Sequence, residues 1–278
     1  MHSGSWLNLH LRLHYAATGR RPVPPDAPPP PDGPEWTAAV AYYRARFGDR
    51  GGMGLIFDDE LVALSRHLAA LGSATELSGV DAPLAEHLRA VATQVDWQTE
   101  DARNRAWMKS LEPLLREHGP AMRAELTSVY GVAWPKQPIR VDVSCFGGPF
   151  GAFTVDDPPH IIISSCHPGY RGEAALEMIF HEASHVLIGP IEHKLEASAK
   201  RLDRPLPEDL WHAVLFYTAG ACVERRVPDY VPYATRNDLD MVQRLLPALR
   251  QSWQPYLDRK TTLDEAIDAL VLAASGAP

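Results

Sequence analysis

Long apolar runs and blocks of like charge are both missing from this 278-residue sequence. A membrane-spanning helix needs about 18 or more consecutive apolar residues, and no such run occurs. The net charge is −8, from 27 Lys+Arg and 35 Asp+Glu. A nucleic-acid-binding protein more often shows a basic excess or a basic stripe. We therefore expect neither a membrane span nor a nucleic-acid partner.

Cysteine is scarce as well, with Cys145, Cys166 and Cys222 in the whole chain. Three scattered cysteines are too few for a disulfide framework or a cysteine-based zinc knuckle, although one Cys145–Cys166 bridge is left open. A secretory signal needs a continuous apolar stretch of about 7–15 residues, and here Asn8 and Arg12 interrupt the N-terminal apolar residues. Without a signal peptide or a transmembrane segment, we expect a cytoplasmic protein.

Proline is abundant, with 25 residues, and eight of the thirteen residues in 22–34 are proline. Such a segment favours extended polyproline II geometry because it has few amide donors. Our interpretation is a stiff arm, so that 1–34 forms an N-terminal segment and a Pro-rich arm. The alternative is that 22–34 binds a partner that recognises proline-rich sequence.

The remaining sequence changes its hydrophobic period twice. Between 138 and 165, residues 139–143 alternate strictly and 161–163 is a β-branched run, which predicts a small sheet of two to four strands. Helical spacing precedes and follows this segment. The order of helices, small sheet and helices predicts an α+β fold that is mostly helical. The expected helices are 35–47, 58–71, one long helix or two over 83–118, 171–188, 191–202, 208–226, 237–253 and 261–274.

An HExxH motif runs from His181 to His185 within an apolar helical segment, and Gly189-Pro190 is expected to end that helix. Residues four apart on a helix lie on one face, so both imidazoles can reach one cation. Neutral imidazole is a standard zinc ligand. Glu182 lies beside the ligand pair, where its carboxylate can take a proton from metal-bound water. This pattern predicts a catalytic metal site.

The motif and its surroundings resemble the zincin metallopeptidases over about 138–226, closest to sparsely characterised bacterial zincin-like proteins. The resemblance implies a small sheet ahead of the active-site helix, with an edge strand along the cleft that receives extended peptide. Residues 160–165 would be that strand. The longer metzincin signature is not present, because Ile188 and Ile191 occupy its Gly and His positions. We therefore expect three parts: the N-terminal segment and Pro-rich arm 1–34, a helical region 35–135 and a zincin-like catalytic region 136–278, the last two forming one domain or two.

A catalytic zinc ion normally has three protein ligands and an open position for water. Two candidates for the third ligand lie on the helix expected over 208–226: His212, within an apolar segment, and Glu224, in the manner of the gluzincin branch. They lie about 18 Å apart along a continuous helix, so they cannot share one ion. We favour His212, because two arginines follow Glu224 and indicate a solvated charge cluster. His193 and Glu196 are further alternatives.

The transition state of peptide hydrolysis also needs a donor to the developing oxyanion. Three tyrosines are candidates for this donor. We favour Tyr230 and Tyr233 over Tyr217, because both belong to a segment that could cover a cleft, and of these two we choose Tyr233. Each of these tyrosines could instead be a packed core residue.

Together these features predict a zinc-dependent hydrolase, most simply a metallopeptidase that acts on a peptide or amide substrate. His181, His185 and His212 would bind Zn2+, and Glu182 would act as the general base. Two alternatives stay open: a metal-dependent amidase acting on a small molecule or cell-wall fragment, and a catalytically inactive zincin-like binding or scaffold protein.

Overall fold

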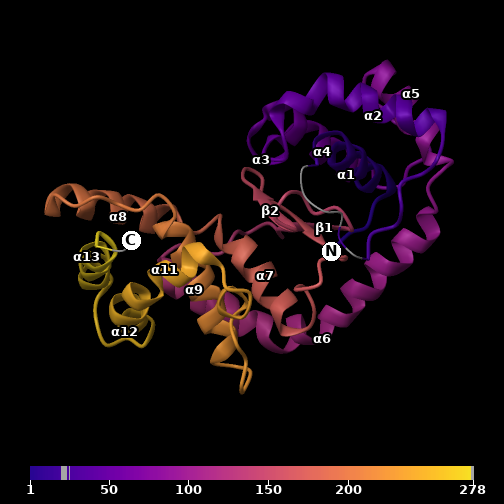
Figure 1. The fold of residues 1–278 in the computed structure, drawn as a ribbon. Helices are drawn as coiled ribbons and strands as arrows, with labels where there is room; N and C mark the ends of the chain where they lie inside the picture. The colour runs from indigo at the N-terminus through magenta and orange to yellow at the C-terminus, as the bar shows by residue number, and fades with distance from the viewer. Residues whose placement is uncertain (20–23, 25, 277–278) are drawn as a thin grey trace. The chain divides into compact units, whose positions relative to one another are not determined.

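The computed structural model describes residues 1–19, 24 and 26–276, and Figure 1 shows the order of their helices and strands. Helices predominate, and the strands form one small sheet, so the α+β class is confirmed. The helices are α1 (Ser5–Thr18), α2 (Pro34–Phe47), α3 (Gly54–Phe57), α4 (Asp59–Leu71), α5 (Ala82–Ala92), α6 (Trp97–Tyr130), α7 (Glu173–Ser184), α8 (Gly189–Leu202), α9 (Leu210–Glu224), α10 (Tyr233–Arg236), α11 (Asp240–Ala248), α12 (Gln254–Leu257) and α13 (Leu263–Ala274). The strands are β1 (Arg140–Ser144), β2 (Ala152–Val155) and β3 (His160–Ser164).

The chain forms two compact units, and each combines segments that are distant in sequence. Unit 1 comprises Met1–Glu112 and Pro138–Arg171, and unit 2 comprises Pro113–Gln137 and Gly172–Pro278. This division differs from the expected regions 35–135 and 136–278. Residues of α6 belong to both units, and the sheet lies in unit 1 whereas the HExxH helix lies in unit 2. Sequence-local composition does not reveal such a division, because it depends on which segments pack together.

Capping aspartates define where several helices of unit 1 begin. Asp58 accepts a hydrogen bond from the backbone N–H of Leu61 at 3.0 Å, which caps α4. Asp96 accepts one from Thr99 at 3.1 Å at the start of α6. Each cap satisfies a backbone donor that the first helical turn leaves without an intrahelical partner. The segment 83–118 therefore contains two helices rather than one.

The sheet has the order β1-β3-β2, with β1 parallel and β2 antiparallel to β3. A sheet of two to four strands is thus confirmed, with three. The expectation that 160–165 supplies an edge strand is wrong, because β3 is the central strand. All five residues of β3 are buried, and its β-branched run packs best where both flanks are covered. Its backbone donors and acceptors are used by its two neighbours.

Helix α1 is the second departure from expectation. The sequence predicts 1–34 as an N-terminal segment and a Pro-rich arm, but Ser5–Thr18 forms a helix whose leucines lie in the core of unit 1. Several of its polar residues are buried too, and two of them have clear partners: Nδ1 of His10 lies 3.0 Å from the hydroxyl of Tyr43, and Arg12 forms an ion pair with Glu100. Leucine at every second position does not match a helical stripe, which is why the helix was missed.

The Pro-rich arm lies against this helix where the structure describes it. Arg12 donates a hydrogen bond to the carbonyl of Pro28 at 3.4 Å and to that of Pro29. Residues 22, 23 and 25 of the proposed partner-binding segment 22–34 lie outside the described residues. The partner itself remains a prediction.

A disulfide joins Cys145 and Cys166, whose Cα atoms are 4.8 Å apart. The two cysteines follow β1 and β3, which are neighbours in the sheet, so strand pairing brings them together. The bridge that the sequence left open is therefore present. Cys222, in unit 2, is free and buried.

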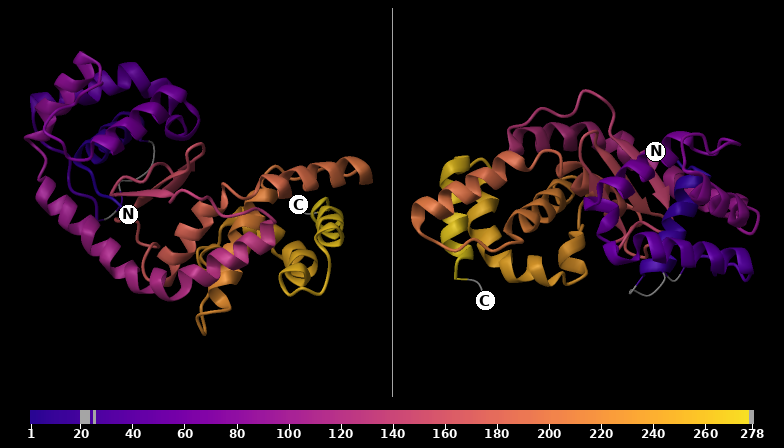
Figure 2. Two further views of the ribbon diagram at one scale, coloured as in Figure 1. Left: turned by 180° about the vertical axis from the view of Figure 1, so that it is seen from behind. Right: turned by 90° about the horizontal axis from the view of Figure 1, so that it is seen from above.

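In unit 2, α7 packs against α9 and α8 packs against α13, as Figures 1 and 2 show. Helix α7 ends at Ser184, and Gly189-Pro190 begins α8 instead of ending the motif helix. Proline fits the first turn of a helix because backbone N–H groups there have no intrahelical acceptor, so the absence of an N–H in proline removes no hydrogen bond. The fully buried Trp253 donates its indole N–H to the hydroxyl of Thr218 at 2.9 Å, which ties the C-terminal helices to α9. No helix in the described part of the chain combines the length and the apolar character needed to cross a membrane.

Candidate metal centre

The candidate site is built from two packed helices of unit 2, α7 and α9. His181 lies on α7 and His185 is the residue that caps its C-terminal end one turn later, while His212 and Phe216 lie one turn apart on α9. The ring of Phe216 stacks on that of His181 with centroids 3.9 Å apart, and the rings of His185 and His212 are 5.3 Å apart. The helices therefore run antiparallel, and His212 lies near both histidines of the motif, with its ring centroid 5.1 Å from that of His181.

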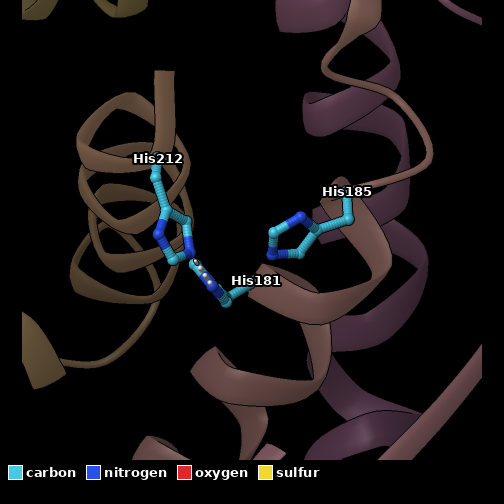
Figure 3. A group of neighbouring side chains, drawn as sticks. All are labelled: His181, His185 and His212. Atoms are coloured by element: carbon cyan, nitrogen blue, oxygen red, sulfur yellow. Dashed lines mark hydrogen bonds between the residues drawn. The ribbon is translucent and has the colours of Figure 1, made fainter. Parts of the chain in front are cut away.

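This packing gathers three histidines around one point. Ligand atoms of His181, His185 and His212 all lie within 4.8 Å of one another, and Figure 3 shows the three rings converging from the two helices. The Nε2 atoms of His181 and His212 are 3.2 Å apart. Two ligands of a tetrahedral zinc ion with bonds of about 2.0–2.1 Å lie about 3.3 Å apart. The donor set and this spacing fit a divalent cation such as zinc.

Burial keeps these imidazoles neutral, which is the form that binds metal. Burial lowers the pKa of His181 well below its usual value, and a charge on either neighbouring histidine would lower it further. Burial lowers the pKa of His185 to about 3 and that of His212 to about 4. Protons therefore compete weakly for these nitrogens at neutral pH.

Glu182 follows His181 on α7 and is buried, with 4% of its surface exposed. Successive residues of a helix point about 100° apart, so its carboxylate lies beside the ligand face rather than on it. A carboxylate in that position can accept a proton from water held at the site.

The other ligand candidates lie elsewhere in unit 2. Glu224 is the last residue of α9, and its exposed carboxylate lines a cavity of about 240 Å³ together with Tyr217, Tyr230 and Arg250. It is not part of the histidine group. His193 and Glu196 are exposed on α8 and do not belong to the group either. Among the four candidates, the structure brings only His212 to the HExxH histidines.

The two arginines that follow Glu224 belong to a cluster of charged side chains, as the sequence predicts. Arg225 and Arg226 both form ion pairs with Glu125, and Arg225 also contacts Asp258 at 3.0 Å. A charge cluster therefore occupies this helix end.

The three tyrosines have different hydrogen-bond partners. The hydroxyl of Tyr217 donates to Oε1 of Gln254 at 2.7 Å. The hydroxyl of Tyr230 donates to Oε2 of Glu177 at 2.6 Å, and the backbone N–H of Tyr233 donates to the same oxygen at 2.9 Å. Tyr233 is buried at the start of α10. The assignment of Tyr233 as the oxyanion donor stays a prediction.

Glu177 is the residue that the sequence analysis missed. It is fully buried on α7, and burial raises the pKa of its carboxyl to about 7. A signal for it was present: Glu173, Glu177, His181 and His185 recur every fourth residue, so they share one helix face. An acidic residue at that spacing within an apolar segment indicates a role beside the histidines.

Comparison of the chain with protein-family models, with curated proteins and with solved structures found no match.

Proposed function

We propose that this protein is a zinc-dependent hydrolase, specifically a metallopeptidase that acts on a peptide or amide substrate. The observation that supports the proposal is the convergence of His181, His185 and His212 next to the buried Glu182. Three neutral imidazoles are a common ligand set for catalytic zinc, and zinc leaves one further position open for water. Zinc is proposed from ligand type, since imidazole also binds other divalent ions of the first transition row.

The three histidines would hold the ion through ring nitrogens, and the bound ion would supply Lewis acidity and lower the pKa of water. Glu182 would accept a proton from that water and pass it to the leaving amine. Phe216 stacks on His181 and restricts its ring plane. Tyr233 would donate a hydrogen bond to the developing oxyanion.

The compartment is a separate question. The sequence pattern predicts the cytoplasm, whereas a buried disulfide between Cys145 and Cys166 favours an oxidising compartment. Thiol counting on protein isolated from its native cell under alkylating conditions distinguishes the two. One reactive thiol after denaturation supports an oxidising compartment, and three support the cytoplasm.

Metal content tests the ligand assignment directly. We expect about one zinc ion per chain in the wild type and in Glu224→Ala, and none in His212→Ala, by elemental analysis after dialysis. Since Glu224 and His212 lie on the same helix, the two variants are matched controls for helix disruption. Loss of zinc in Glu224→Ala with retention in His212→Ala would contradict the assignment.

Activity is tested with Glu182→Gln against the zinc-loaded wild type on a fluorogenic peptide library. We expect Glu182→Gln to keep its zinc and lose turnover, because the amide cannot accept the proton. Full activity in Glu182→Gln would contradict the mechanism. Zinc binding without cleavage of peptides, followed by cleavage of small amides or cell-wall fragments, would favour an amidase, and absence of all turnover would favour a binding or scaffold protein.

A further inference from the structure

Glu177 is a buried carboxylate one helical turn before the first histidine of the motif, and its two oxygens have different surroundings. Oε2 accepts hydrogen bonds from the hydroxyl of Tyr230 at 2.6 Å and from the backbone N–H of Tyr233 at 2.9 Å. Oε1 is buried and has no hydrogen-bond partner among the described residues. A buried acceptor without a hydrogen-bond partner destabilises the folded state, so such an atom in a native structure needs a physical explanation.

A second buried atom without a described partner lies one turn away on the same helix face. It is Nδ1 of His181. The other ring nitrogen of His181, Nε2, faces Nε2 of His212 at 3.2 Å. When Nε2 holds a metal ion, the proton of the neutral ring resides on Nδ1, which then needs an acceptor.

The helix geometry makes Glu177 the natural acceptor. Side chains four residues apart on a helix have Cβ atoms about 5–6 Å apart, and they lean toward the helix N-terminus. The ring of His181 therefore lies over the turn that carries Glu177, although Oε1 and Nδ1 are not hydrogen-bonded to each other in this structure. Phe216 stacks on the ring face and leaves its edge available for a hydrogen bond.

The opposite helix leaves space for this carboxylate at Gly220. A Cβ atom at Gly220 would lie 3.4 Å from Oε1 of Glu177 and 2.7 Å from Cβ of Pro232. The segment that begins α10 is thus in van der Waals contact with the backbone of α9, and it presents Tyr230 and Tyr233 to Oε2. These two donors hold one oxygen of Glu177 and leave the other one available.

We propose that Glu177 is a positioning residue of the candidate metal site, whose Oε1 accepts a hydrogen bond from Nδ1–H of His181 when Nε2 of that ring binds the metal ion. The proposal rests on the proposed function, because it needs His181 to be a ligand. Carboxylates that orient ligating histidines fix the ring tautomer and raise the basicity of the ligand, and their loss weakens metal binding about 10–100-fold.

Zinc affinity, measured by competition with a chromophoric chelator, tests the proposal without any substrate. We compare the wild type with Glu177→Gln, Glu177→Ala and the control Glu173→Gln, which lies on the same face one turn earlier. The amide of Gln presents one acceptor oxygen, so Glu177→Gln cannot serve both the tyrosine donors and His181. We expect zinc binding about 10–100-fold weaker in both Glu177 variants and unchanged in Glu173→Gln.

Nuclear magnetic resonance of 15N-histidine-labelled protein supplies a readout that a merely structural role would not move. In the zinc-loaded wild type, we expect Nδ1 of His181 to carry a proton with the downfield shift of a hydrogen bond to a carboxylate. That signal should move or vanish in Glu177→Gln. The wild-type spectrum decides the question even if both variants fail to fold, because an Nδ1–H signal without that shift would overturn the proposal.

The outcomes separate the two proposals. Zinc binding in the wild type with equal affinity in the Glu177 variants overturns the role of Glu177 and leaves the metal site standing. Absence of zinc binding in the wild type overturns both the metal site and the role of Glu177. Equal weakening in Glu173→Gln and Glu177→Gln would also overturn the specific role, since charge alone would then account for it.

Discussion

Reduction of the Cys145–Cys166 disulfide should destabilise unit 1 by a calculable amount. The bond closes a loop with a sequence separation of 21 residues, and it lies in the buried part of unit 1. In the chain-entropy description, a loop of that length restricts the unfolded chain by about 3 kcal/mol at 25 °C. Comparing the oxidised and reduced forms of the wild type leaves every other side chain unchanged.

The assay is urea unfolding of both forms, preceded by a thiol count in denaturant. The chain has three cysteines and one free thiol in the described structure, so we expect one reactive thiol before reduction and three after it. A loss of about 3 kcal/mol corresponds to a midpoint lower by about 1–3 M urea. Zinc content serves as the internal control, because the three histidines belong to unit 2.

Two results would refute this reasoning. Three reactive thiols in carefully oxidised protein would mean that the bridge does not form. An unchanged urea midpoint after full reduction would mean that the loop is already restricted in the unfolded chain, so that the disulfide adds no stability.

Two further predictions concern packing and pH. Gly220→Ala should destabilise unit 2 by about 1–3 kcal/mol, because the new methyl group would lie 2.7 Å from Cβ of Pro232. Thermal unfolding measures this loss, and the control is Gly276→Ala, where a methyl group would meet open space. Equal stability of the two variants would contradict the packing argument. Acid should destabilise unit 1, since burial lowers the pKa of His14 to about 4 in the folded protein. The unfolded chain takes up its proton first, near pH 6.5, so this stability is complete above pH 6.5 and is lost as the pH falls toward 4, by about 3 kcal/mol. Denaturant titrations at several pH values should show a smaller acid loss in His14→Leu, and an identical loss in both proteins would rule out His14 as the cause.

Local sequence patterns predicted much of the fold because helices and strands have short repeats. Helical spacing located α4, α8, α9 and α13, each within a few residues of its observed ends. The same rules missed α1, where leucine at alternate positions hides a helix that is buried on all sides. The edge position expected for β3 came from the resemblance instead, and it was wrong because strand order depends on pairing partners far apart in sequence.

For the candidate site, the sequence by itself determined the HExxH pair, because the helix repeat alone puts His181 and His185 on one face. It also reduced the third ligand to a few residues, since an apolar segment around His212 indicated burial. Only the tertiary structure decided that His212 meets the pair while Glu224 stays outside the histidine group, because that outcome depends on the register of α7 against α9. Likewise, only packing showed that the second oxygen of Glu177 is held by Tyr230 and Tyr233, from a segment more than fifty positions later in the chain. Helix geometry acts over a few residues, whereas the contacts that complete the site are made between segments brought together by burial of apolar surface.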